Sequence, residues 1–226
     1  MKITWLGHSS FRIEIEQAVL LIDPWLEGNP MFPADARAAA LEGATHILLT
    51  HGHSDHASNA KALSTELGLP LVGNYDLIRA IGDVEGVAHL GFNKGGTVDL
   101  GGAKVTMVNA VHSSTYNGQT AGSEAGFMIA GEGQVIYLSG DTDIMADMAW
   151  MGEYHRPDIA IWSCGGFYTM DMARAAWAAK KYFNFKTFIP CHYRTFGALE
   201  QSAASLIAAL PEVNVIEPQV MTSITL

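Results

Sequence analysis

The chain has 226 residues, of which 49% are hydrophobic and 16% are charged, and this composition favours a well-filled globular core over a disordered chain. The formal net charge of −10 argues against nucleic-acid binding, because affinity for nucleic acid depends largely on Lys and Arg contacts to phosphate. It does not exclude a small anionic substrate, since bound metal ions can reverse the local sign of the charge.

The N-terminal segment MKITWLGHSSF lacks the apolar run of a signal peptide. No apolar stretch approaches the roughly 18–20 residues that a membrane-spanning helix requires, so we expect no stable insertion into a membrane. The two cysteines, Cys164 and Cys191, are too few for a disulfide framework. A reduced, cytoplasmic protein is therefore expected.

Apolar periodicity and turn residues predict the secondary structure in chain order. The first half is expected to form strands 2–7, 10–16 and 18–23, a loop 27–33, a helix 34–42, a strand 45–50, a helix 57–68, a strand 69–74, a helix 75–83, a strand 86–92 and a hairpin 97–110. The second half is expected to form a hairpin 124–142, a helix 144–152, a strand 158–164, a helix 170–183, a strand 186–192, a helix 198–210 and a strand 214–226. No internal repeat, low-complexity segment or linker interrupts this order. The sequence therefore predicts one domain over residues 1–226, of the layered α/β class.

The segment Thr50-His51-Gly52-His53-Ser54-Asp55-His56 carries the strongest chemical signal. It follows a predicted buried strand and precedes a helix, and open α/β sheets place their ligands at such strand ends. Imidazoles and carboxylates are common ligands of zinc, iron and manganese, and in a core without partners they would be costly. His51 and His53 can converge from an irregular turn, whereas Asp55 and His56 at a helix start can point elsewhere. One cluster could thus serve two metal ions, and a solvated His-rich loop is the alternative.

Three further residues stand at corresponding positions of the chain. His112, Asp141 and His192 each follow a buried apolar run, as His51 does. A single histidine at a strand end is more often a cap or a solvated residue than a ligand. Four strand ends that all carry a ligand residue favour a metal site.

With these residues, the sequence resembles the metallo-β-lactamase superfamily. The resemblance rests on the His-x-His-x-Asp-His segment at 51–56, on His112, on Asp141 in a Gly-Asp-Thr context, and on the late His192. A closer resemblance is to the prokaryotic metal-dependent hydrolases related to ascorbate-6-phosphate lactonase and to the phospholipase D that acts on N-acyl ethanolamine lipids. It is carried by Gly7-His8-Ser9-Ser10-Phe11, Asp23-Pro24, Gly140-Asp141-Thr142, Gly165-Gly166 before Thr169-Met170, and Ile189-Pro190-Cys191-His192-Tyr193.

The resemblance implies a four-layer αβ/βα sandwich with two divalent metal ions at one edge, between two sheets. It implies that the first ion is held by His51, His53 and His112, and the second by Asp55, His56 and His192, with Asp141 as the bridge. Zinc is the expected metal, and manganese, iron and nickel stay open because His/Asp sites accept all of them.

The implied function is that of a binuclear hydrolase, in which a metal-bound hydroxide attacks an ester-type bond, with a lactone or a phosphodiester expected. Asp55, Asp141 and His8 are the expected catalytic residues, and the expected partner is a small-molecule substrate, while a homo-oligomer stays open. One alternative is a di-iron redox protein on the same fold, but oxygen- or NO-reducing members typically carry Glu at the position of His53 and an appended flavin domain. The other alternative is a non-catalytic metal-binding module, and such relatives usually lose ligands that are intact here.

Several other residues are interpreted from their surroundings. His8, in a Gly-His-Ser-Ser turn, is expected either near the substrate, as a proton donor to the leaving group, or as a turn cap. Asp23 is expected either to orient a ligand histidine or to be exposed. Cys164, which replaces Ile in a Pro-Ile-Gly-Gly stretch of many relatives, and Cys191 are expected in the core. Trp150, Trp162 and Trp177 are expected in the core rather than as a stacking platform. Tyr116, Tyr168 and Tyr193 flank the loops expected at the site and could donate to a developing oxyanion, but this role is not the expectation for any one of them. His46, His89 and His155 are expected as structural or solvated residues.

Overall fold

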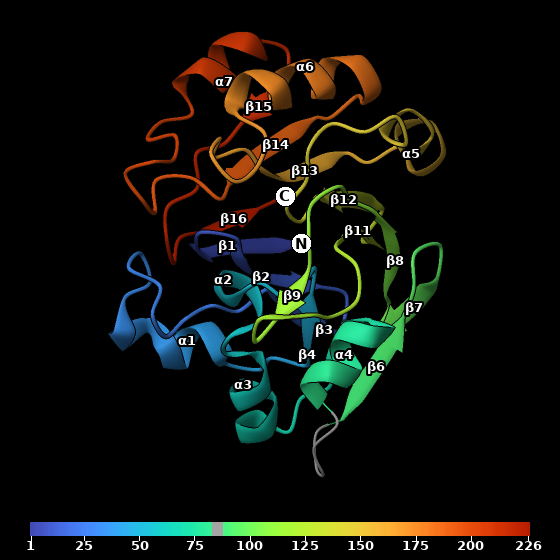
Figure 1. The fold of residues 1–226 in the computed structure, drawn as a ribbon. Coiled ribbons are helices and arrows are strands. Elements are labelled where there is room, and N and C mark those ends of the chain that lie inside the picture. The colour runs from blue at the N-terminus through green and yellow to red at the C-terminus, as the bar shows by residue number, and fades with distance from the viewer. Residues whose placement is uncertain (83–87) are drawn as a thin grey trace.

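The computed structural model describes residues 1–82 and 88–226, which form two seven-stranded sheets stacked face to face (Figure 1). The first sheet has the order β16 (Ser223–Thr225), β1 (Lys2–Gly7), β2 (Ser10–Ile15), β3 (Ala18–Ile22), β4 (His46–Leu49), β5 (Leu71–Asn74) and β6 (His89–Phe92). The second has the order β15 (Asn214–Val215), β14 (Thr187–Cys191), β13 (Ile159–Ser163), β12 (Gln134–Leu138), β11 (Ala125–Gly131), β8 (Ala103–Asn109) and β7 (Thr97–Leu100). A small hairpin, β9 (Thr115–Tyr116) and β10 (Gln119–Thr120), stands apart from both sheets.

Helices cover the outer face of each sheet (Figure 1). The first sheet is covered by η1 (Ala34–Ala36), α1 (Arg37–Leu41), α2 (Ser54–Ala57), α3 (Ala60–Leu67) and α4 (Tyr75–Gly82), and the second by α5 (Met148–His155), α6 (Met172–Tyr182) and α7 (Ala204–Ala209). Figure 1 thus shows four layers, helix, sheet, sheet and helix, and the predicted four-layer αβ/βα sandwich is confirmed.

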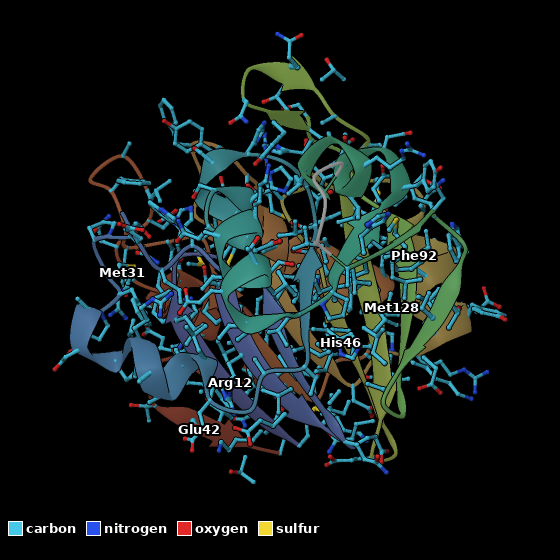
Figure 2. All side chains as sticks on the ribbon, turned by 90° about the horizontal axis from the view of Figure 1, so that it is seen from below. Arg12, Met31, Glu42, His46, Phe92 and Met128 are labelled. Carbon is cyan, nitrogen blue, oxygen red and sulfur yellow. The ribbon has the colours of Figure 1, made fainter. Side chains whose placement is uncertain are left out.

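Strand β3 illustrates why these sequences form buried strands. Leu20 and Ile22 belong to the core between the sheets, while Leu21 faces the helices on the outer side. Successive side chains of a strand point to opposite faces, so a strand buried on both sides needs the continuous apolar run seen here. The helix layer is tied to the same sheet by Arg12 of β2, whose Nη1 donates to the carbonyl oxygens of Ala40 at 3.2 Å and Glu42 at 2.6 Å, at the end of α1 (Figure 2).

Most predicted elements are confirmed, with shifts at their ends. Helix α3 ends at Gly68, whose φ of +67° lies in the left-handed region that terminates helices. Helix α6 begins after Asp171, whose side chain accepts a hydrogen bond from the backbone N–H of Arg174 at 2.8 Å. The end of the helix predicted over 75–83 and the start of the strand predicted over 86–92 lie outside the described residues. Among the residues that are described, no helix is long and apolar enough to cross a membrane.

Three expectations about the second half were wrong. The helix predicted over 144–152 forms at Met148–His155, and the one predicted over 198–210 is limited to Ala204–Ala209. The C-terminal segment is not one strand, because β15 pairs with β14 of the second sheet while β16 pairs with β1 of the first. The chain crosses between the sheets in the intervening stretch, which contains Pro218, and proline has no N–H to continue a ladder.

The tryptophans divide between the core and the outer surface. Trp162 on β13 is completely buried, as expected. Trp150 on α5 and Trp177 on α6 are 47% and 51% exposed, so their expected place in the core was wrong. Both belong to the outer helix layer, where one face of each helix meets solvent.

Candidate metal centre

Several of the expected ligand residues follow the carboxyl ends of parallel strands, whereas Asp55 and His56 belong to helix α2 and His112 follows β8, which is antiparallel to both of its neighbours. In the first sheet β3, β4 and β5 run parallel, and in the second β12, β13 and β14 do so. His51 follows β4, Asp141 follows β12 and His192 follows β14 directly. The carboxyl ends of parallel neighbours meet at one edge of a sheet, which is where such folds place ligands.

The structure gathers the seven expected ligands, together with His8, into overlapping groups whose potential ligand atoms lie within 4.8 Å of one another. The groups are His51, His53 and His112; His8, Asp55, His56 and His192; and His51, His56 and Asp141. The first and second groups correspond to the two ligand sets expected from the sequence, with His8 as an additional member of the second.

Asp141 lies between the two groups. Its Oδ2 is 4.0 Å from Nε2 of His51 and 3.7 Å from Nε2 of His112, on the side of the first group. The same oxygen is 3.4 Å from Nε2 of His56 and 3.0 Å from Nε2 of His192, on the side of the second. One carboxylate oxygen therefore faces imidazole nitrogens of both groups.

The buried polar atoms of this cluster fit a cation. Nε2 of His56 and Oδ1 of Asp141 are buried and have no hydrogen-bond partner among the described residues. Unpartnered polar atoms in a protein interior cost several kcal/mol, roughly 1–3 each in mutational data. Imidazole nitrogen and carboxylate oxygen are a donor set that suits divalent metals, so the residues present fit metal ions at this place.

Burial and the neighbouring charges shift the pKa values of the side chains in this cluster. Burial lowers the pKa of His51 well below its ordinary value. Burial, the largest single effect, disfavours the charged form of His56 and His192. The neighbouring carboxylates, Asp141 first among them, together outweigh it and raise the pKa of His56 well above its ordinary value and that of His192 to about 9. For Asp141 itself burial acts upward, yet His192 and His56 hold the pKa well below its usual range.

Asp23 contacts His56 directly and His51 through the Thr50 hydroxyl. Its carboxylate is buried and accepts hydrogen bonds from the backbone N–H of Thr50 at 2.8 Å, from the Thr50 hydroxyl at 2.6 Å and from Nδ1 of His56 at 2.8 Å. The Thr50 hydroxyl lies 3.0 Å from Nδ1 of His51. With Nδ1 occupied in this way, Nε2 of each ring is left to face the cluster. The expected contact between Asp23 and a ligand histidine is therefore present. The alternative, an exposed Asp23 side chain, is wrong because the residue is buried.

His8 is held beneath Asp55. Its ring is completely buried, with Nε2 2.9 Å from Oδ2 of Asp55 and Nδ1 2.7 Å from the Thr195 hydroxyl. Its carbonyl oxygen accepts from the indole N–H of Trp5 at 2.8 Å and from the backbone N–H of His192 at 3.0 Å. Burial lowers the pKa of His8 to about 4, against the raising effect of the hydrogen bond to Asp55.

This position changes the interpretation of His8. A direct proton donor to a leaving group needs a ring edge that reaches the substrate, and a fully buried ring does not offer one. His8 does not belong to the wall of the cavity that opens over the cluster. Its Nε2 instead meets the carboxylate of Asp55, which does line the cavity.

Both cysteines lie beside the centre without belonging to it. Cys164 and Cys191 are buried in the core, as expected, and burial raises the pKa of both thiols. Neither is in a ligand group among the described residues. The adjacent Gly165 is required by close packing, because a Cβ at that position would overlap the carbonyl oxygen of His192.

The cavity over the cluster has a volume of about 690 Å³, a size that suits a small organic ligand. Its walls comprise Trp25, Gly52, His53, Ser54, Asp55, Ser58, His112, Ser113, Thr115, Tyr116, Asn117, Gly118, Asp141, Tyr168, His192 and Phe196. Tyr116 and Tyr168 thus stand at the cavity, as expected. Tyr193 does not, because its ring is completely buried and its hydroxyl donates to Glu217 at 3.3 Å.

Trp25, Phe196 and Thr195 are among the residues of this site that sequence reasoning missed. Trp25 and Phe196 line the cavity, and Thr195 supports His8. Trp25 lies two residues beyond Asp23, and Thr195 and Phe196 lie shortly after His192. Proximity to a ligand residue was the only signal that could have found them, because none has a ligand-type side chain.

The chain has close relatives among known proteins. Residues 2–192 match the family model of the β-lactamase superfamily domain, and the chain belongs to this superfamily. It is 67% identical over 228 residues to a UPF0173 metal-dependent hydrolase of Cereibacter sphaeroides, with 99% of each chain covered. A UPF0173 metal-dependent hydrolase of Paracoccus denitrificans is 66% identical over 230 residues, with 100% of each chain covered.

A solved structure has the same architecture. Igni18, a metallo hydrolase from the archaeon Ignicoccus hospitalis, is 27% identical and superposes with a TM-score of 0.86, covering 100% of this chain and 98% of that one. The chain is therefore a metal-dependent hydrolase of the metallo-β-lactamase superfamily, and as a hydrolase it acts on a small-molecule substrate.

Proposed function

We propose that the chain hydrolyses an ester-type bond, a lactone or a phosphodiester, with two divalent metal ions, zinc first among them. The observation that carries the proposal is the position of Asp141, whose Oδ2 lies within 4.0 Å of imidazole nitrogens from both ligand groups. A carboxylate oxygen so placed is suited to bridge two ions. Seven ligand side chains are also more than one tetrahedral ion uses.

The ligands are assigned from the groups that the side chains form. The first ion would be held by His51, His53 and His112, the second by Asp55, His56 and His192, and both by Asp141. His8 is left out of the ligand set because its Nε2 is hydrogen-bonded to Asp55 at 2.9 Å and its Nδ1 to Thr195 at 2.7 Å. Its assigned task is to fix the orientation of the Asp55 carboxylate.

When bound, the ions would lower the pKa of a water molecule and polarise the oxygen of the bond to be cleaved. Asp55 is the carboxylate placed to handle the proton of that water, because its side chain is 27% exposed and lines the cavity, whereas Asp141 is 2% exposed. Tyr116 and Tyr168 lie on the cavity wall, where a phenolic O–H can donate a hydrogen bond to the oxygen that gains charge.

The test combines metal analysis with hydrolysis. Protein purified without chelator should contain close to two ions per chain, and His56→Ala or His192→Ala should lose one of them while His51→Ala or His112→Ala loses the other. Hydrolysis of lactones and phosphodiesters should stop with chelator and return with metal. Less than half an equivalent of metal after reconstitution with zinc or manganese would end the proposal.

A further inference from the structure

The charge of the cavity wall restricts what the cavity can bind. Besides the ligand histidines and aspartates, the wall residues are aromatic, hydroxyl-bearing, amide or glycine, and none of those described is a lysine or an arginine. Sites that recognise a phosphate or carboxylate group usually present such a cation, often an arginine that binds two oxygens at once. A negatively charged substituent away from the reacting bond would find no lysine or arginine among the described residues of this wall.

Two arginines lie beside the site without lining the cavity. Arg174 lines a neighbouring hollow of about 200 Å³, where its Nη1 is 3.9 Å from Oδ1 of Asp143. The guanidinium of Arg194 lies over the rings of Trp5 and Tyr193, 5.7 and 5.5 Å from their centroids. Neither arginine belongs to the wall of the large cavity.

Aromatic rings from three separate loops line the cavity instead. Trp25 follows β3, Tyr168 follows β13 and Phe196 follows β14. The rings of Trp25 and Phe196 are 6.3 Å apart and tilted by 37°, and the ring of Tyr168 is 6.5 Å from that of His192. Tyr168 and Phe196 are 57% and 41% exposed, and large apolar surfaces exposed in a concave site are characteristic of ligand contact.

We propose that the substrate is a carboxylic ester or lactone that has no anionic substituent and carries a flat apolar group, held against Trp25, Phe196 and Tyr168. The inference rests on the hydrolase function proposed above and narrows its substrate class. A planar apolar group would cover the exposed rings by stacking or edge contacts. The reacting carbonyl would face Asp55 and Asp141, and hydrolysis would add one water, break the acyl C–O bond and leave an acid and an alcohol.

Three lactones with the same reacting bond test the inference. They are γ-butyrolactone bearing hydrogen, phenyl or carboxylate on its γ carbon, and bis(4-nitrophenyl) phosphate is the phosphodiester probe. With metal-loaded protein, kcat/KM for the phenyl lactone should exceed that for the unsubstituted lactone by about tenfold, the effect expected from burying one large apolar group. The carboxylate lactone and the phosphodiester should be slower than the unsubstituted lactone.

Substitutions in the cavity wall test which residues cause the expected preference for the phenyl lactone. Trp25→Ala and Phe196→Ala should each raise KM for the phenyl lactone by roughly five- to tenfold, and should raise KM for the unsubstituted lactone by a smaller factor. The matched control is Trp177→Ala, which removes a tryptophan that is 51% exposed on α6. Ser58→Lys adds a cation to the wall and should raise kcat/KM for the carboxylate lactone, whereas Ser205→Lys on α7 should not.

The possible results distinguish a failure of this substrate inference from a failure of the proposed hydrolase function. If the carboxylate lactone or the phosphodiester is hydrolysed faster than the unsubstituted lactone, the exclusion of anionic substrates is wrong, while the proposed hydrolase function stands. Unchanged KM in both Trp25→Ala and Phe196→Ala, with metal content and melting temperature preserved, would overturn the aromatic subsite. No hydrolysis of any of the four compounds by protein that carries two ions would remove the proposed function and the inference together.

Discussion

Replacing Asp23 by asparagine should selectively weaken the second metal site. Oδ2 of Asp23 accepts hydrogen bonds from the Thr50 hydroxyl at 2.6 Å and from Nδ1 of His56 at 2.8 Å, while Oδ1 accepts from the Thr50 backbone N–H at 2.8 Å. In Asp23→Asn the remaining carbonyl oxygen can keep the backbone bond only if the amide NH2 takes the place of Oδ2. That NH2 then faces the N–H of Nδ1 on His56, donor against donor.

His56 can relieve this clash by moving its proton from Nδ1 to Nε2, which directs a proton at the cluster instead of a lone pair. Loss of such a supporting hydrogen bond typically costs 10–100-fold in metal affinity, which is about 1.4–2.7 kcal/mol. His51 should suffer less, because the Thr50 hydroxyl, 3.0 Å from its Nδ1, can rotate to accept from both neighbours.

The assay is zinc titration of metal-free protein, with competition by a chelator to give two separate dissociation constants. Asp35→Asn, on the exposed surface of η1, is the matched control and should leave both constants unchanged. Wild-type affinity at both sites in Asp23→Asn would refute the orienting role of Asp23. Equal losses at both sites would refute the direct link to His56 and favour a general loss of structure.

Three further predictions follow from the same geometry. Asp141→Asn should lower kcat at least about a hundredfold with a smaller change in KM, because a bridging carboxylate sets the spacing and charge of the ion pair; near-native turnover would exclude the bridge. His8→Ala should lower turnover by about tenfold, equally for good and poor leaving groups, because His8 acts through Asp55; a loss confined to poor leaving groups would restore it as a direct proton donor. Zinc binding to metal-free protein at pH 7 should release protons and tighten as the pH rises towards about 9. Burial lowers the pKa of His192, but Asp141 and Asp55 together outweigh it and raise this pKa to about 9, so that a proton must leave before Nε2 binds a metal. Calorimetry in buffers with different ionisation enthalpies measures this release, and the absence of any proton release would contradict it.

The strands and the ligand residues could be predicted because their signals are local. An apolar run such as the one in β3 is fixed by burial on both faces, and His51, Asp141 and His192 follow such runs directly. Because parallel strands place their carboxyl ends together, residues that are distant in sequence are expected to meet at one edge of the fold.

The remaining features depend on contacts that no local pattern encodes. The turn around His8 was recognised, but its burial beneath Asp55 depends on Thr195, more than a hundred residues away in the chain. Trp25, Tyr168 and Phe196 line the cavity from three different loops, and none of these loops has a periodic sequence pattern. The C-terminal segment was interpreted as one strand because its composition does not reveal that β15 and β16 belong to different sheets.

Three residues of the candidate metal centre have a strained backbone conformation. His8, Asp23 and His192 have φ values of +54°, +43° and +59°, in the left-handed region that costs residues other than glycine about 1 kcal/mol or more. Glycine would remove that strain at each position but also the side chain that contacts the cluster. The carbonyl oxygen of His8 links the two strained histidines to the core, because it accepts from the backbone N–H of His192 and from the indole N–H of Trp5. Because Trp5 is completely buried between the two sheets, the packing of the core fixes where these two histidines stand, and the site is preorganised by the same contacts that hold the sandwich together.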